Sequence, residues 1–307
     1  MINELDGGIK GALNRALKCG NLRYKTTCAL FDKMGYSNHE IQDLEVRNKV
    51  YKYLQKHYSK FLDTYSYDEK DRGAETNDVW ICWLQGMNNA PDIVKVCYKS
   101  VKKWIPDKQI HVIDQDNLFD YVKLPNHVIS KWKKGIISNT LFSDFIRLSV
   151  LTQFGGIWVD ATVFFSGPLP DYIVRSDFFM YRCSPYDRAK FGESWFIKVE
   201  AHNYVIEETL KLLCEYWKRE NKIRDYFQMF IFMKIVVSSN MDTIKNMVYI
   251  PNAIPHMLQN YLNHPFNEQI YNDICSVTNI HKLTYKNLNN NDGTFANFII
   301  EKGYKEK

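Results

Sequence analysis

Three charged side chains, Asp144, Arg147 and Asp160, lie in otherwise apolar sequence, and their types and spacing could support chemistry. From Ile137 to Leu151 apolar residues surround nearly the whole circumference of an expected helix, which is typical of a helix buried in a larger protein. A buried charge is costly unless it is paired, and residues at i,i+3 on a helix can pair or share a polar ligand. Asp144 and Arg147 therefore predict an internal ion pair or a ligand site.

A turn and a buried strand are expected directly after this helix. Gly155 and Gly156 predict the helix end, because glycine reaches the positive φ that a helix C-cap requires. The run from Ile157 to Phe165 has β-branched and aromatic residues around a single acid, and it predicts one short buried strand with Asp160 at its exit. Open α/β sheets bind ligands at the carboxyl ends of their strands, so this acid is placed for ligand chemistry.

The segment before this helix predicts the sheet that must position the charged residues. A strand from Val79 to Leu84, a helix from Pro91 to Trp104 and a strand from Gln109 to Asp114 alternate in the βαβ manner of a parallel sheet. Gln85 and Asp114 would then fall at carboxyl ends of strands. Asp114 could equally cap a turn, and both interpretations stay open.

Residues 1–75 predict a helical N-terminal extension, and residues 76–307 the main domain. The extension ends in the charged run 68–73, which favours a solvated link. Its apolar residues at helical spacing are Val46, Val50, Leu54, Tyr58 and Leu62.

The order and spacing of these motifs resemble the sugar-binding DXD region of retaining glycosyltransferases with a GT-A fold, most closely the capsular polysaccharide synthesis branch. The matching pattern there is a Ser-Asp-x-x-Arg helix, an aromatic-Gly-Gly turn and a hydrophobic strand that ends in Asp. Further matches are Val79 to Gly86 with Ala90-Pro91, Ser194 to Ile197, and His281 to Lys286. The resemblance implies an α/β protein with a GT-A-like, Rossmann-type, mainly parallel sheet flanked by helices.

The resemblance also implies roles for individual residues. In such families the helix Asp and Arg contact the ribose and uracil of a UDP-sugar, which gives those roles to Asp144 and Arg147. One of the two tryptophans near the first strand is expected beside the uracil, although both could equally be core residues. The residues expected around the nucleotide-sugar are Trp80, Trp83, Gln85, Asp114, Asp144, Arg147, Gly156 and Lys282. The expected catalytic residues are Asp160, Glu193 and Trp195, although Glu193 could also be an ordinary surface glutamate.

A metal site is implied with one departure from the general pattern. The first acid of the motif matches Asp160, but the second, which usually ligates Mn²⁺ or Mg²⁺, is Thr162 here. A hydroxyl is a weaker, neutral donor for a hard cation, so metal dependence is open, with water-mediated binding as an alternative. His281 is the expected third ligand, although a lone histidine is often structural. Lys282 is expected to neutralise the leaving diphosphate.

The resemblance implies a bacterial hexosyltransferase that uses a UDP-sugar donor and extends a capsular or other surface polysaccharide, with retention of configuration. The expected acceptor is an oligosaccharide, which can be lipid-linked. Two alternatives stay open: a glycosylating effector that modifies a protein, and a non-catalytic nucleotide-sugar-binding protein, because Thr162 departs from the motif.

Composition limits the location and the partners. Seven scattered cysteines favour reduced thiols and a cytoplasmic protein. A net charge of +5 is too small and dispersed for nucleic-acid binding. No segment reaches the ~18 apolar residues of a membrane span. The run 131–134 mixes lysines with a tryptophan and predicts either peripheral contact with the inner face of the membrane or a solvated charged turn.

Overall fold

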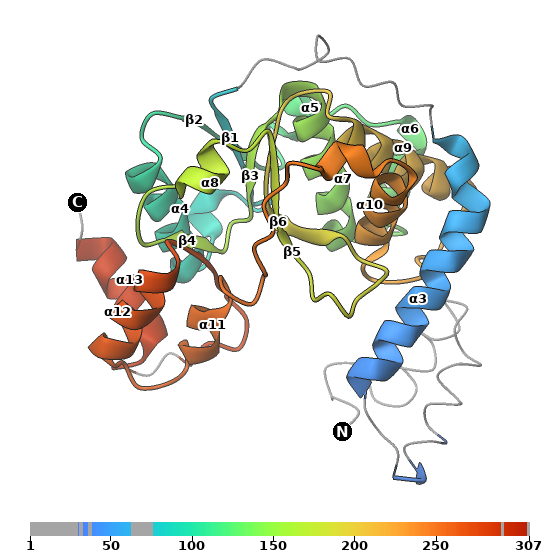
Figure 1. The fold of residues 1–307 in the computed structure, drawn as a ribbon. Helices are drawn as coiled ribbons and strands as arrows, with labels where there is room; N and C mark the ends of the chain where they lie inside the picture. The colour runs from blue at the N-terminus through green and yellow to red at the C-terminus, as the bar shows by residue number, and fades with distance from the viewer. Residues whose placement is uncertain (1–29, 31–32, 36–38, 63–75, 290–291, 306–307) are drawn as a thin grey trace.

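A computed structural model describes this chain except for residues 1–29, 31–32, 36–38, 63–75, 290–291 and 306–307. The described part is an α/β structure built on a central five-stranded sheet with helices on both faces (Figure 1). In spatial order the strands are β2 (Gln109–Ile113), β1 (Asp78–Cys82), β3 (Gly156–Val159), β6 (Gly192–Val199) and β5 (Phe178–Arg182).

The sheet is mostly parallel. Strand β1 pairs in parallel with both β2 and β3, whereas β6 pairs antiparallel with β3 and with β5. Four strands therefore run in one direction and β6 runs against them. This confirms the expected α/β class with a mainly parallel sheet flanked by helices.

Alternate residues of the same strands supply two separate cores. Trp80 and Trp158 face the core built with helices α7 (Asn139–Phe154), α9 (Tyr204–Arg219) and α10 (Gln228–Ser239). Their strand neighbours Val79 and Ile157 face the opposite core. Side chains alternate across a strand, so a sheet covered on both faces needs apolar residues at every position. The second core is built with α4 (Asp92–Trp104), α8 (Asp171–Val174), α11 (Met257–Tyr261), α12 (Glu268–Val277) and α13 (Phe295–Lys305).

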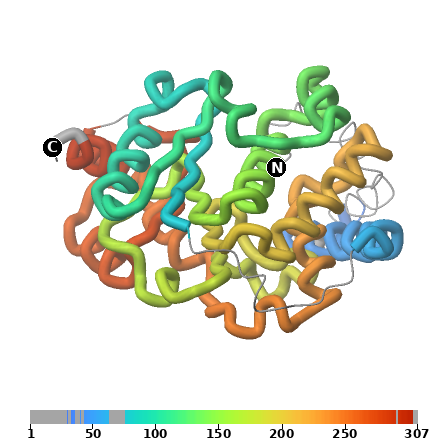
Figure 2. The backbone as a smooth tube through the Cα atoms, turned by 90° about the horizontal axis from the view of Figure 1, so that it is seen from above, coloured from blue at the N-terminus to red at the C-terminus, as the bar shows by residue number. Residues whose placement is uncertain are grey.

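The two ends of the described chain lie on opposite sides of the sheet (Figures 1 and 2). Helix α3 (His39–Tyr58) packs on α10, and its residues Val50, Leu54 and Tyr58 belong to the same core as α7. This helix confirms the helix predicted from the spacing of Val46, Val50, Leu54 and Tyr58, and it ends before Leu62. The boundary between an extension and a main domain at residues 75 and 76 stays a prediction, because residues 63–75 lie outside the described part.

One expected strand is in fact two strands in two different sheets. Strand β3 ends at Val159, and β4 (Val163–Phe165) pairs antiparallel with β7 (Ile280–Lys282). Between them the Val163 N–H donates to the Asp160 carbonyl at 2.9 Å, which closes a tight turn. The single strand predicted from Ile157 to Phe165 is therefore wrong, because this turn directs the chain out of the first sheet.

At residues 131–134 the structure also differs from the predicted solvated charged turn. This run lies at the end of helix α6 (Asn126–Lys133), which follows the short α5 (Leu118–Tyr121). Lys131 Nζ donates to the Glu220 carbonyl at 2.8 Å, and the Trp132 ring stacks on Phe142 with centroids 4.1 Å apart. These two side chains therefore have packing roles.

Two findings bear on location. In the described residues no helix has both the length and the apolar character that crossing a membrane requires. The five cysteines of this part are free thiols, while Cys19 and Cys28 lie outside it.

Candidate functional site

Asp160 lies at the carboxyl end of β3 and is surrounded by hydrogen-bond donors. Its Oδ1 accepts from Trp158 Nε1 at 2.8 Å and from Arg147 Nη2 at 3.0 Å. Its Oδ2 is 3.9 Å from Lys282 Nζ. The backbone N–H of Asp160 donates to the Trp195 carbonyl at 2.8 Å, which ties this turn to β6. The predicted acid is therefore held between two cations.

The electrostatic environment keeps this carboxylate ionised. Burial by itself raises the pKa of Asp160, but the charges of Arg147 and Lys282 and the hydrogen bonds from Trp158 and Arg147 outweigh it. The pKa of Asp160 consequently lies below its ordinary value. Asp160 is thus an anion and a hydrogen-bond acceptor at neutral pH.

Helix α7 supplies the other two charged residues of the site. Arg147 forms an ion pair with Asp144 one turn earlier and reaches Asp160 with its second terminal nitrogen. Its guanidinium carbon lies 5.1 Å from the centroid of the Trp158 ring. Burial raises the pKa of Asp144 to about 6, although Arg147 opposes this shift. The i,i+3 pair expected from the sequence is confirmed, and the structure adds Asp160 as its third member.

The second sheet brings Lys282 to this cluster. Lys282 pairs in register with Val163, and its ammonium donates to Thr162 Oγ1. The backbone N–H of Leu283 donates to the Thr162 carbonyl at 2.9 Å. Asp160, Thr162 and Lys282 are therefore brought together, although some 120 residues separate the last from the others.

His281 points the other way. Consecutive residues of a strand face opposite sides, so Lys282 and His281 cannot share one site. His281 is fully buried and makes a 2.8 Å hydrogen bond to Ser166 Oγ, and burial lowers its pKa to about 4. Its Nδ1 has no hydrogen-bond partner in the described part of the chain. The metal-ligand role of His281 stays a prediction that this placement does not favour.

Glu193 and Trp195 lie on β6 beside the Asp160 turn. Glu193 Oε1 accepts from Lys190 Nζ and from Asn252 Nδ2, both at 2.9 Å. Its side chain is only 12% exposed, so the interpretation as a surface glutamate is wrong. The Trp195 ring stacks on Tyr181 at 4.6 Å, and its Nε1 is buried without a partner among the described residues. Both residues adjoin the site, and their catalytic roles stay predictions.

His256 was missed in the sequence, and it borders the site. Its Nδ1 is 2.7 Å from the Asn252 carbonyl, so Nδ1 carries the proton and the neutral ring leaves Nε2 as an acceptor. The ring lies edge-on to Trp195 with centroids 5.8 Å apart. The preceding carbonyl, of Pro255, accepts from the Lys282 N–H at 2.9 Å. A single histidine outside any motif gives no signal of such a long-range contact.

A second residue missed in the sequence is Tyr226, in the segment before α10. Burial raises the pKa of its phenol, and the negative charge of Asp144 adds to this effect. The side chain is nevertheless 63% exposed. Tyr226 is therefore an exposed aromatic residue within electrostatic reach of the charged site.

Three further predicted residues lie at the carboxyl edge of the parallel strands, the edge at which Asp160 also lies. Trp83 follows β1 and packs edge-on against Tyr285, and Gln85 is exposed in the next turn. Asp114 follows β2, and its Oδ1 accepts from the N–H groups of Asp116 at 3.0 Å and of Asn117 at 3.2 Å. The turn-capping interpretation of Asp114 is thereby confirmed, while nucleotide contacts of these residues stay predictions.

Trp80 and Gly156 lie away from the charged cluster. Trp80 Nε1 donates to the Gly155 carbonyl at 2.9 Å, and its ring stacks on His111 in the core. Gly156 begins β3, with φ of 95°, and a Cβ there would lie 2.4 Å from the Asp78 carbonyl oxygen. Both residues thus have structural roles at the opposite end of β3. Of the two tryptophans, Trp83 is the one near the carboxyl edge.

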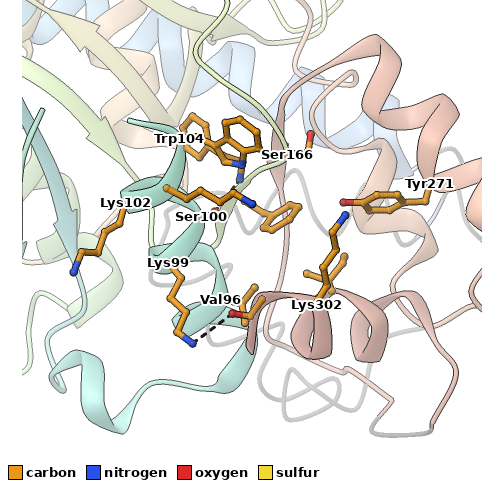
Figure 3. Close-up of a pocket in the computed structure, with 13 residues that line it drawn as sticks. Val96, Lys99, Ser100, Lys102, Trp104, Ser166, Tyr271 and Lys302 are labelled. Atoms are coloured by element: carbon orange, nitrogen blue, oxygen red, sulfur yellow. Dashed lines mark hydrogen bonds between the residues drawn. The ribbon is translucent and has the colours of Figure 1, made fainter. Parts of the chain in front are cut away.

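A pocket of about 540 Å³ lies elsewhere, between α4, β4, α12 and α13 (Figure 3). Its walls include Trp104, Tyr271 and Ser166, and Lys302 projects toward Tyr271. None of the four charged residues of the cluster lines this pocket. The candidate site is therefore the charged cluster at the carboxyl edge of the sheet.

Comparison with known proteins gives one family. Residues 33–300 match the family described as "Capsular polysaccharide synthesis protein". No curated protein sequence matches this chain. A solved structure described as "PaToxG Glycosyltransferase" is similar at 15% sequence identity with a TM-score of 0.41, and the alignment covers 66% of this chain and 82% of that one.

Proposed function

Since this chain belongs to the capsular polysaccharide synthesis protein family, we propose that it is a GT-A glycosyltransferase that transfers a hexose from a UDP-sugar to a growing surface polysaccharide. The observation that carries this proposal is the convergence of Arg147, Asp160 and Lys282 at the carboxyl edge of the parallel strands. Nucleotides bind at this edge in open α/β sheets. Two cations there suit an anionic diphosphate.

The reaction needs positive charge where the diphosphate departs. The bond from the sugar C1 to the β-phosphate oxygen breaks, and a bond from C1 to an acceptor hydroxyl oxygen forms. The acceptor proton moves to the departing phosphate, and the sugar passes through an oxocarbenium-like state. Preorganised cations stabilise the charge that develops on the leaving group, and we assign this role to Lys282, whose ammonium donates to Thr162 Oγ1.

We propose retention from the resemblance to retaining GT-A enzymes, and for a retaining enzyme the contacts of Asp160 favour a front-face route over double displacement. Its Oδ1 is occupied by Trp158 and Arg147, and its Oδ2 faces Lys282. A carboxylate held by hydrogen bonds and by two cations is a weak nucleophile, so a covalent sugar intermediate on Asp160 is disfavoured. We assign to Asp160 the positioning of both cations, and to Asp144 with Arg147 the ribose and uracil contacts.

Turnover of a panel of UDP-sugars tests this proposal, with released UDP as the readout. The wild type should release UDP from at least one donor, and Asp160→Asn should lower this rate by about 100-fold or more, the usual effect of losing one preorganised electrostatic contact. Asp171→Asn is the matched control, because that side chain is 84% exposed on α8.

The outcomes separate the proposal from its alternatives. A wild type that binds a UDP-sugar but never releases UDP, even with oligosaccharide or protein acceptors present, would identify a non-catalytic binding protein. Transfer to a protein but not to an oligosaccharide would favour a glycosylating effector. Equal rates of UDP release in the wild type and in Asp160→Asn would show that the charged cluster takes no part in the reaction.

A further inference from the structure

The residues around Asp160 do not fit a divalent metal ion. The fold family implies Mn²⁺ or Mg²⁺, and in nucleotide sites such hard cations are held by one or two protein carboxylates together with substrate phosphates and waters. Here the second acid of the motif is Thr162, which is neutral, and the expected third ligand, His281, faces Ser166 on the other side of its strand. Among the described residues no group of three or more His, Cys, Asp and Glu side chains could hold a metal ion.

An ammonium group already contacts the two remaining candidate ligands. Lys282 Nζ donates to Thr162 Oγ1 and lies 3.9 Å from Asp160 Oδ2. Arg147 contacts the other oxygen of the same carboxylate at 3.0 Å. A divalent ion between these groups would lie beside two positive charges, and Coulomb repulsion in a partly buried site is weakly screened. In this arrangement the ammonium group and a divalent ion therefore compete for the same two oxygens, Asp160 Oδ2 and Thr162 Oγ1.

We propose that the Lys282 ammonium replaces the divalent metal ion as the cation that binds the diphosphate of the nucleotide. This inference rests on the proposed function and makes nucleotide binding independent of metal. It also gives a physical reason for Thr162. An aspartate there would form a second, closer ion pair with Lys282 and neutralise more of its charge, whereas a hydroxyl accepts a hydrogen bond from the ammonium and keeps its own O–H for a phosphate oxygen.

The second sheet holds Lys282 in place for this role. Its backbone N–H donates to the Pro255 carbonyl at 2.9 Å, and the strand pairs Lys282 with Val163. The next N–H, of Leu283, donates to the Thr162 carbonyl at 2.9 Å. These contacts fix the backbone of Lys282, and the hydrogen bond of its ammonium to Thr162 orders the side chain, so less conformational entropy is lost when a phosphate binds.

Calorimetry with UDP, uridine and inorganic pyrophosphate tests this inference, each with a chelator or with Mn²⁺. The wild type should bind UDP with the same affinity, within about twofold, in both conditions. Lys282→Met should weaken UDP and pyrophosphate binding by about 10- to 100-fold, which corresponds to one charged hydrogen bond. Uridine binding should not change, because uridine has no phosphate. Lys282→Arg should restore most of the affinity, and Lys134→Met, an exposed lysine just after α6, should have no effect.

A double variant gives a sharper test. Thr162→Asp combined with Lys282→Met places a second carboxylate beside Asp160 and removes the competing ammonium, so the UDP affinity of this variant should depend on Mn²⁺. Wild-type UDP binding that disappears with chelator and returns with Mn²⁺ would overturn the role of Lys282 while leaving the proposed function in place. A wild type that binds neither UDP nor pyrophosphate nor any nucleotide-sugar would overturn both.

Discussion

Arg147 makes the central connection at the residue scale, because one guanidinium holds two carboxylates from different elements. It pairs with Asp144 on its own helix and with Asp160 at the end of β3. A planar guanidinium can make such divergent contacts, whereas a lysine is a single point charge. The two carboxylates respond differently, since the pKa of Asp160 falls while that of Asp144 rises to about 6. The fixed anion next to Lys282 is therefore Asp160.

Asp144 should make folding stability depend on pH between about 4 and 7. Its folded pKa of about 6 lies above its ordinary 3.8, so the folded state binds more protons in this range than the unfolded state. The free energy of unfolding should therefore rise as the pH falls through 6, and Asp144→Asn should lack this contribution. From pH 7 to pH 5, the free energy of unfolding of the wild type should rise by about 1 kcal/mol more than that of Asp144→Asn. Urea unfolding of both proteins at the two pH values measures this difference.

Titration of the neighbouring Asp160 does not interfere with this measurement. Asp160 has a lowered pKa, so its contribution to stability is lost only as the pH falls below its ordinary range. Equal pH dependence of unfolding in the wild type and in Asp144→Asn would show that Asp144 is ionised throughout, with its charge satisfied by Arg147.

At the element scale, segments with strong local patterns were predicted well. Helix α7, helix α4 and strand β1 occur within a few residues of their predicted bounds, since periodic apolar residues and the glycines at 155 and 156 define them locally. The break after Asp160 was not predicted, because apolar residues continue through β4. What separates β3 from β4 is the pairing of β4 with β7, more than 110 residues later.

The glycine turn before β3 should be sensitive to substitution. Gly156→Ala would place a Cβ 2.4 Å from the Asp78 carbonyl oxygen at a φ of 95°, so both backbone strain and a clash oppose it. We expect a loss of unfolding free energy of about 2 kcal/mol or more, measured by urea denaturation. Gly135→Ala is the control, because that glycine also has a positive φ of 70° but no atom within 4 Å of the added Cβ. Similar losses in both variants would mean that strain alone matters.

Tertiary contacts decided the parts of the site that the sequence left open. Whether His281 or Lys282 faces Asp160 depends on the register of β4 with β7, which no local pattern reveals. His256 reaches the site through the Pro255 carbonyl and Trp195, and both contacts join distant segments. By contrast, Asp144, Arg147 and Asp160 were predicted because charges in apolar sequence need partners.

At the scale of the whole molecule, the sheet separates two cores and presents the charged cluster at one edge. Helix α3 joins the core of α7, α9 and α10, so residues before the first strand help to support the helix that carries Arg147. The family match likewise begins at residue 33 and includes this helix. The pocket between α4 and α13 lies apart from the cluster and has no part in the proposed reaction.

The central claim is that this cluster binds a uridine nucleotide, and calorimetry with UDP, GDP, ADP and CDP on the wild type and on Arg147→Lys tests it most directly. Arg147→Lys keeps the charge but not the planar group that reaches both carboxylates, and Arg175→Lys is the control at an 81% exposed position. We predict UDP-selective binding that weakens by about 10-fold or more in Arg147→Lys alone. Binding of no nucleotide, or UDP binding that is equally tight in all three proteins, would contradict this claim.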